Sequence, residues 1–182
     1  MNLLKTFTSL ATGAITFSLI IAGQTFAQEN PKLSDAEVAS VAVTANQIDI
    51  DYAAIATKNS KNEAVLPFAK TMASDHKAVI DQAVALVTKL KVTPQDNAVS
   101  KQLLADAEKT STKLSSLSGK AFDKAYIENE VAYHKAVIGA VEGLLIPESE
   151  NAELKALLQN VVPALKAHLA HAEMVQKQHA SK

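Results

Sequence analysis

Apolar residues recur at every third or fourth position along most of the chain, and this period predicts amphipathic helices. Four long stretches show it clearly, at about 34–62, 63–91, 120–146 and 150–178. A weaker, more polar stretch lies between the second and the third, at about 98–117. No stretch alternates with the period of two that a half-buried strand requires. The pattern therefore predicts an all-α protein.

Residues with known helix-ending or helix-starting preferences divide these stretches. Residues 34–37 (Ser-Asp-Ala-Glu) have the spacing of a capping box at the start of the first helix. Residues 93–97 break the chain after the second helix, Gly119 stops the weaker one, and residues 147–149 end the next. Pro163 falls inside the last helix, where it should produce a kink at a cost of ~3 kcal/mol.

Four long amphipathic helices predict an up-down four-helix bundle. The weaker helix is either a fifth strut or a crossover that runs the length of the bundle between the second and third long helices, as in ferritin-like folds. With the crossover, and counting about 1.5 Å per residue from the turns, Asp49, His76, His134 and His168 lie at one level to within about one helical turn. We therefore predict the ferritin-like arrangement.

The N-terminus has the features of a cleaved signal peptide. Lys5 provides the positive charge, residues 15–23 the apolar segment, and residues 25–27 a small-residue cleavage signal. The apolar segment is too short for a membrane span. Residues 1–27 are therefore predicted to be removed, and residues 28–182 to form one domain. We expect this domain to be exported and soluble, in the periplasm or associated with the outer envelope, with no transmembrane span.

Composition narrows the possible partners. The chain has 18 basic and 19 acidic residues, and its net charge is −1. Every basic residue is a lysine, whereas arginine is the usual ligand of phosphate and guanine. Nucleic acid is therefore excluded as an expected partner. The chain has no cysteine, so disulfides are excluded and any metal must have nitrogen and oxygen ligands.

Three histidines occupy the centre of the apolar face of three different helices. Residues 3, 4, 7 and 11 positions away from His76, His134 and His168 are almost all apolar. A buried imidazole has to be hydrogen-bonded or bound to something. Three of them on separate helices predict one shared site inside the bundle.

Two carboxylates can complete such a site. Asp49 lies about 60° from the centre of the apolar face of its helix, from which a short side chain can still turn inward. Glu130 is one turn before His134 on the same face, as a ligand or as an acceptor that fixes an imidazole tautomer. The sequence predicts a site for a single transition metal ion (Zn, Cu, Fe or Ni) with these ligands: Asp49, His76, Glu130, His134 and His168.

Two other interpretations remain open at this point. In one, the histidines and acids form a metal-free polar network with Tyr126 or Tyr133, in a structural, stress-related or partner-binding bundle of the envelope. In the other, the histidines are partly exposed and unrelated. A third reading, an enzyme with histidine as general base, has the weakest support. The sequence shows neither a nucleophile motif nor a glycine-rich phosphate loop, so whether the protein is an enzyme stays undecided.

Four short motifs in order resemble the bacterial family catalogued as domain of unknown function 4142, often labelled predicted outer-membrane protein. They are Asp-Ile-Asp at 49–51, residues 68–76 ending in Asp-His, residues 122–126 with His134 following, and residues 163–169 around His168. The resemblance covers about residues 34–178. It implies an exported ferritin-like bundle and no assigned activity.

The chain differs from its relatives at one position of the predicted site. The family usually has Glu where this chain has Asp49, which is shorter by one methylene and gives Glu130 more weight as a ligand. The Glu-x-x-His pairs of di-iron ferritins are also missing, since Glu130 and His134 are four residues apart. A ferroxidase activity therefore does not follow from the resemblance.

Overall fold

The computed structural model describes residues 31–180, and within them the chain forms five helical rods and no strand. The all-α prediction is confirmed. The predicted signal peptide lies outside the described residues. The helices are α1 (Asp35–Asn59), α2 (Val65–Leu90), α3 (Ala98–Ser115), a continuous rod of α4 (Gly119–Ala140), η1 (Val141–Leu145) and α5 (Ile146–Glu148), and α6 (Ala152–Ala180).

The helix ends follow the local sequence. Ser34 and Glu37 form the predicted capping box at the start of α1. Asn97 caps α3, where its side chain accepts hydrogen bonds from two backbone amides. Gly119 has a φ of +55°, a conformation that glycine adopts without strain, at the corner between α3 and α4. The predicted break at 93–97 and the end of the long helix near Glu148 are both confirmed.

One turn differs from the predicted regular helix. Residues 141–145 form a π-helix, in which the amide of Ile146 bonds to the carbonyl of Val141 five residues earlier. Pro147 follows directly, and in an α-helix its ring would clash with the carbonyl of Gly143. We attribute the wider turn to this proline.

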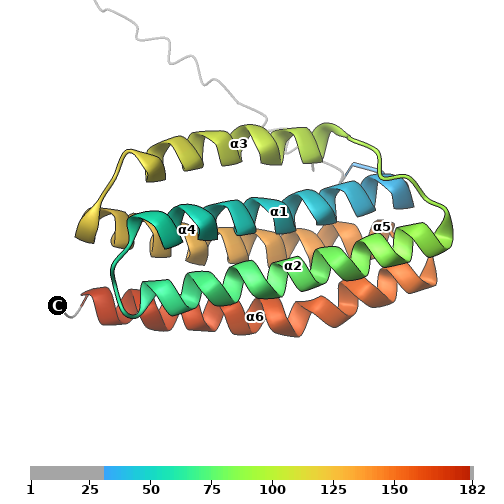
Figure 1. The fold of residues 1–182 in the computed structure, drawn as a ribbon. Coiled ribbons are helices and arrows are strands. Elements are labelled where there is room, and N and C mark those ends of the chain that lie inside the picture. The colour runs from blue at the N-terminus through green and yellow to red at the C-terminus, as the bar shows by residue number, and fades with distance from the viewer. Residues whose placement is uncertain (1–30, 181–182) are drawn as a thin grey trace, which may run out of the picture.

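The rods lie along one another, with α3 on the outside (Figure 1). α1 packs most closely on α2, and α4 on α6, so the four long helices form two pairs. α3 lies on α1 and runs back along the molecule from the end of α2 to the start of α4. As a result α2 and α4 run in the same direction (Figure 1). No described helix is both long and apolar enough to cross a bilayer.

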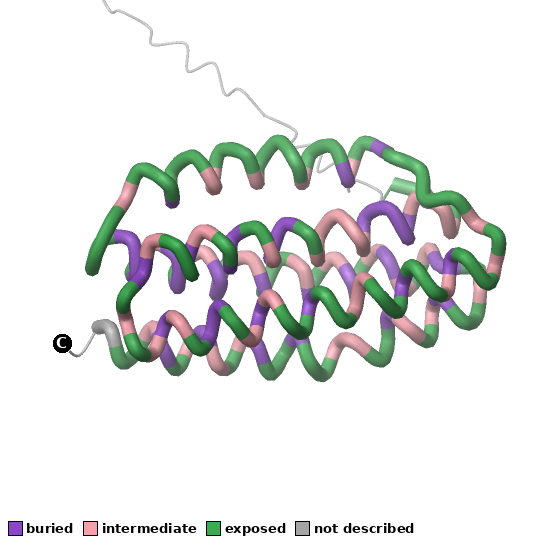
Figure 2. The backbone as a smooth tube through the Cα atoms, in the orientation of Figure 1, coloured by how far each residue is buried: buried purple, intermediate pink, exposed green. Residues whose placement is uncertain are grey.

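Buried residues line the faces that the helices turn toward each other (Figure 2), and they form two clusters. The aromatic cluster lies where α2 and α4 begin, and it contains Phe68, Phe122 and Tyr126. The aliphatic cluster lies at the other end and contains only Leu, Val and Ile, with Val41, Leu145 and Leu158 among its members. The three predicted histidines belong to neither cluster.

Candidate metal centre

The structure brings all five predicted site residues together from the four long helices. α1 supplies Asp49, α2 His76, α4 both Glu130 and His134, and α6 His168. All five are buried, and Asp49 and Glu130 are 0 % exposed. Each pair of helices therefore contributes part of one buried cluster, which we call the histidine cluster.

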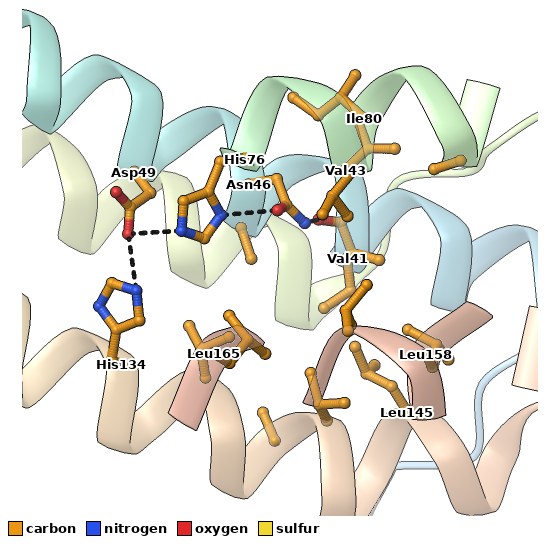
Figure 3. Close-up of a pocket in the computed structure, with 18 of the residues that line it drawn as sticks. Val41, Val43, Asn46, Asp49, His76, Ile80, His134, Leu145, Leu158 and Leu165 are labelled. Atoms are coloured by element: carbon orange, nitrogen blue, oxygen red, sulfur yellow. Dashed lines mark hydrogen bonds and ion pairs between the residues drawn. The ribbon is translucent and has the colours of Figure 1, made fainter. Parts of the chain in front are cut away.

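The potential ligand atoms lie close to one another. One nitrogen of each of the three imidazoles lies within 4.8 Å of one nitrogen of each of the other two. Oδ2 of Asp49 lies 3.4 Å from Nε2 of His76 and 3.7 Å from Nε2 of His134 (Figure 3). One atom each of Asp49, Glu130 and His134 forms a second set within the same limit.

The proton of His76 is placed by a neighbouring amide. Nδ1 of His76 lies 2.8 Å from Oδ1 of Asn46 (Figure 3). The amide nitrogen of Asn46 donates to the carbonyl of Ala42 at 2.8 Å, which fixes the amide with its oxygen toward the ring. Nδ1 of His76 is therefore the donor, and Nε2 of the neutral ring carries a lone pair.

The other two histidines are held in the same manner. Nδ1 of His134 donates to the backbone carbonyl of Glu130 at 3.0 Å, an oxygen that can only accept. Nε2 of His168 donates to Oδ2 of Asp75 at 3.0 Å. The remaining nitrogens, Nε2 of His134 and Nδ1 of His168, have no hydrogen-bond partner, and neither has Nε2 of His76.

The histidine cluster thus contains three buried lone pairs without a hydrogen-bond donor. Lone pairs cannot hydrogen-bond to each other, so they require a cation or a hydrogen-bond donor between them. Metal-bound histidines in proteins show this arrangement, in which one ring nitrogen donates to an oxygen while the other binds the ion.

Burial keeps the imidazoles neutral. Burial, together with the positive charge that His134 and His168 carry when protonated, lowers the pKa of His76 to about 3. Burial likewise lowers the pKa of His134 to about 4, although the bond to the Glu130 carbonyl partly opposes the change. Neutral imidazole is the form that binds metals, so both rings are ready for ligation at physiological pH.

The two carboxyl groups shift in the opposite direction. Burial raises the pKa of Asp49 to about 7. Burial and the nearby charge of Asp49 raise the pKa of Glu130 well above its usual range. The oxygens of Asp49 have no hydrogen-bond partner, and the Tyr126 hydroxyl offsets only part of the rise in the pKa of Glu130. A bound cation would compensate these buried charges and favour their ionised forms.

These residues fit a transition metal. A tetrahedral ion with ligands at about 2.0–2.1 Å separates its ligand atoms by about 3.4 Å, close to the distances of 3.4 and 3.7 Å from Oδ2 of Asp49 to the imidazoles of His76 and His134. Three imidazoles and a carboxylate suit Zn²⁺, Cu²⁺, Fe²⁺ and Ni²⁺. His76, His134, His168 and Asp49 would hold the ion, which would supply a Lewis acid or a redox centre.

Both carboxylates of the predicted site, Asp49 and Glu130, lie in the cluster. Oε2 of Glu130 lies 3.5 Å from Nδ1 of His134, yet that nitrogen donates to the backbone carbonyl of Glu130. The proposed role of Glu130 in fixing a tautomer is thus performed by its backbone. The hydroxyl of Tyr133 donates to the backbone carbonyl of Ala45 at 2.8 Å, and the hydroxyl of Tyr126 lies beside the carboxyl group of Glu130.

Sequence reasoning missed the two side chains that hold histidines from outside the cluster. Asn46 lies three residues before Asp49 on the same face of α1, and this spacing was the available signal. Asp75 is half exposed, but it bonds across to His168 of α6. No local signal predicted that contact. His171 lies outside the cluster, with its ring 5.1 Å from that of Phe68.

Asp75 allows a test of whether side chains outside the cluster hold the histidines in place. The substitution Asp75→Ala removes the acceptor that orients His168, and we expect it to weaken metal binding by about 10- to 100-fold. Titration calorimetry with Zn²⁺ measures the change. Asp81→Ala is the matched control, because Asp81 is exposed on the same helix and pairs only with Lys77. Equal affinities of the two variants would contradict the role of Asp75.

The fold and the site together define an all-α protein with a buried cluster of histidines and carboxylates. The family described as domain of unknown function (DUF4142) matches residues 22–175, and the chain belongs to this family. No curated protein and no solved structure matches the chain significantly.

Proposed function

We propose that this protein binds one transition metal ion between its two helix pairs, through His76, His134, His168 and Asp49, with Glu130 as the second carboxylate. Three imidazoles in one buried cluster, each with one nitrogen held by an oxygen acceptor and the other without a partner, carry this proposal. Such an arrangement is typical of metal-binding histidines.

The setting of this site is part of the proposal. We propose that residues 1–27 direct export and are removed, and that residues 28–182 form one ferritin-like domain in the periplasm or at the outer envelope. The return of the chain along α3 supports this topology. We propose that the protein stores or senses a metal or uses it in redox chemistry. An open coordination position would permit catalysis, and a closed one would not.

A metal-free polar network is the second candidate, and one observation favours it. When protonated, the carboxyl group of Asp49 can donate to one of the two imidazole nitrogens that lie 3.4 and 3.7 Å away. One proton satisfies one of three lone pairs, however, and leaves the others without a donor. A bound metal ion would accept all three lone pairs.

Elemental analysis of protein purified from its native host, combined with thermal melting before and after chelation, tests the proposal. We expect about one transition metal ion per chain and a lower melting temperature after the metal is removed, because a ligand that binds only the folded state stabilises it. Metal-free protein that takes up none of Zn²⁺, Cu²⁺, Fe²⁺ and Ni²⁺ in solution would overturn it.

A further inference from the structure

A large cavity extends from the histidine cluster into the aliphatic half of the core. Its volume is about 690 Å³, and Asp49, His76, His134 and His168 are among its lining residues. Figure 3 shows the polar side chains at one end and Val41, Leu145 and Leu158 at the other. The volume falls within the range of sites that hold small molecules, about 300–1,000 Å³.

The lining determines what the cavity can hold. Away from the cluster, the buried lining residues are aliphatic or alanine, among them Val41, Leu145, Leu154 and Leu158. The polar lining residues Asp106, Thr110 and Asn129 are exposed or partly exposed. Water is a poor occupant of such a surface, because each buried water needs two to four polar partners. The aromatic residues of the core lie mainly at the opposite end of the molecule. The surface therefore suits a flexible hydrocarbon.

The length of the cavity suits an alkyl chain of about a dozen carbons. It follows α2 from His76 to Val87 and α4–η1 from His134 to Leu145, eleven residues in each case. This distance is about 16 Å along a helix. Carbon–carbon bonds of about 1.5 Å in a zigzag advance about 1.3 Å per carbon, so roughly a dozen methylenes span it.

We infer that this cavity binds the acyl chain of a fatty acid, with the carboxylate at the histidine cluster and the chain among the aliphatic residues. The position of the carboxylate rests on the proposed metal, because an ion held by the three histidines and Asp49 offers it a fifth ligand position and offsets the charge of Asp49. The position of the chain does not depend on the metal. Exposed lining residues such as Gln82 and Asn160 show that the cavity reaches the surface, where a chain can enter.

Chain length gives the first test. Octanoate, decanoate and dodecanoate are titrated into zinc-loaded wild-type protein by calorimetry. Each buried methylene should raise affinity by about fourfold, so dodecanoate should bind roughly 200-fold more tightly than octanoate. Affinity that does not depend on chain length, or no saturable binding, would overturn the inference.

A matched pair of variants locates the chain. Ala83 is buried and lines the cavity, so Ala83→Phe fills space that the chain needs. Ala85 is exposed two residues further along α2 and does not line it, so Ala85→Phe is the control. In metal-free protein we expect Ala83→Phe to weaken dodecanoate binding by about tenfold or more and Ala85→Phe to leave it unchanged. Equal binding by both variants would place the chain elsewhere.

Head-group chemistry separates this inference from the proposed function. Zinc loading should tighten decanoate binding by about tenfold and leave decanol within about twofold. An equal response of acid and alcohol would overturn the position of the carboxylate while the metal site stands. Failure of zinc to bind would overturn the proposed function and the proposed position of the fatty-acid carboxylate. The two phenylalanine variants in metal-free protein would then still decide where the acyl chain lies. Unchanged zinc affinity in Ala83→Phe shows that this variant folds.

Discussion

Replacing His134 with alanine is expected to weaken metal binding by roughly 10²- to 10³-fold. Four-ligand structural zinc sites bind with about 10–16 kcal/mol, and one ligand accounts for about a quarter of that. His134 belongs to both sets of potential ligands, so its loss affects each of them. Metal at a thousandfold excess over its dissociation constant stabilises wild-type protein by about 4 kcal/mol. This corresponds to roughly 10 °C in melting temperature, which the variant should lose.

The comparison with and without chelator distinguishes the two candidate functions. A metal-free network predicts that His134→Ala destabilises the fold equally in both conditions. His171→Ala serves as the control, because His171 packs on Phe68 outside the cluster. It should keep wild-type metal affinity and lose the same small amount of stability in both conditions. Retention of metal-dependent stabilisation by His134→Ala would contradict the proposed site.

The substitution Asp49→Asn is expected to act in opposite directions on stability and on metal binding. Burial raises the pKa of Asp49 to about 7, so at pH 8 the metal-free protein carries a buried charge with no hydrogen-bond partner. An amide removes this charge, and its nitrogen can donate to the imidazoles 3.4 and 3.7 Å away. Metal-free Asp49→Asn should therefore be more stable than wild type at pH 8, by a few kcal/mol. Its metal affinity should fall by about 100-fold.

The pH dependence of this stabilisation has a definite sign. Folded Asp49 keeps its proton up to about pH 7, whereas the unfolded chain releases it near 3.8, so metal-free wild type loses stability as the pH rises through this interval. Glu130, with a raised pKa, acts in the same direction. His76 and His134 act in the opposite direction, but only below about 6.5, where the unfolded chain binds protons that the folded imidazoles do not.

Urea unfolding between pH 6.5 and 8.5 therefore isolates the carboxyl groups. Wild-type protein without metal should lose stability across this range, and Asp49→Asn should lose less. Asp51→Asn is the matched control, because Asp51 is exposed on the same helix and accepts a hydrogen bond from Gln47. It should follow wild type. Identical slopes for wild type and Asp49→Asn would show that the Asp49 carboxyl does not titrate as proposed.

The structural features that could be predicted from the sequence are those that depend on residues close to one another along the chain. The spacing of apolar residues places all five rods to within a few residues, and the capping box at Ser34 sets the start of α1. The same spacing placed His76, His134 and His168 on inward faces, and all three are buried. A histidine at the centre of an apolar face is exceptional enough to be recognised from sequence alone.

The remaining features depend on contacts between helices that are distant in sequence. Asp49 lies near the edge of its face, and only the approach of α2 and α4 makes it fully buried. Asp75 bonds to a histidine 93 residues away, which no local pattern encodes. The cavity reflects imperfect packing between the two helix pairs, and periodicity carries no information about packing density. The π-turn before Pro147 is a local feature, but the helical period does not reveal it.

The division of the histidine cluster between two helix pairs also has a kinetic consequence. Asp49 and His76 come from the first pair, and His134 and His168 from the second, so the complete ligand set exists only after the pairs have docked. Interactions that form after the transition state for folding slow unfolding and leave the folding rate unchanged. A bound ion should therefore lengthen the lifetime of the folded protein without accelerating its formation.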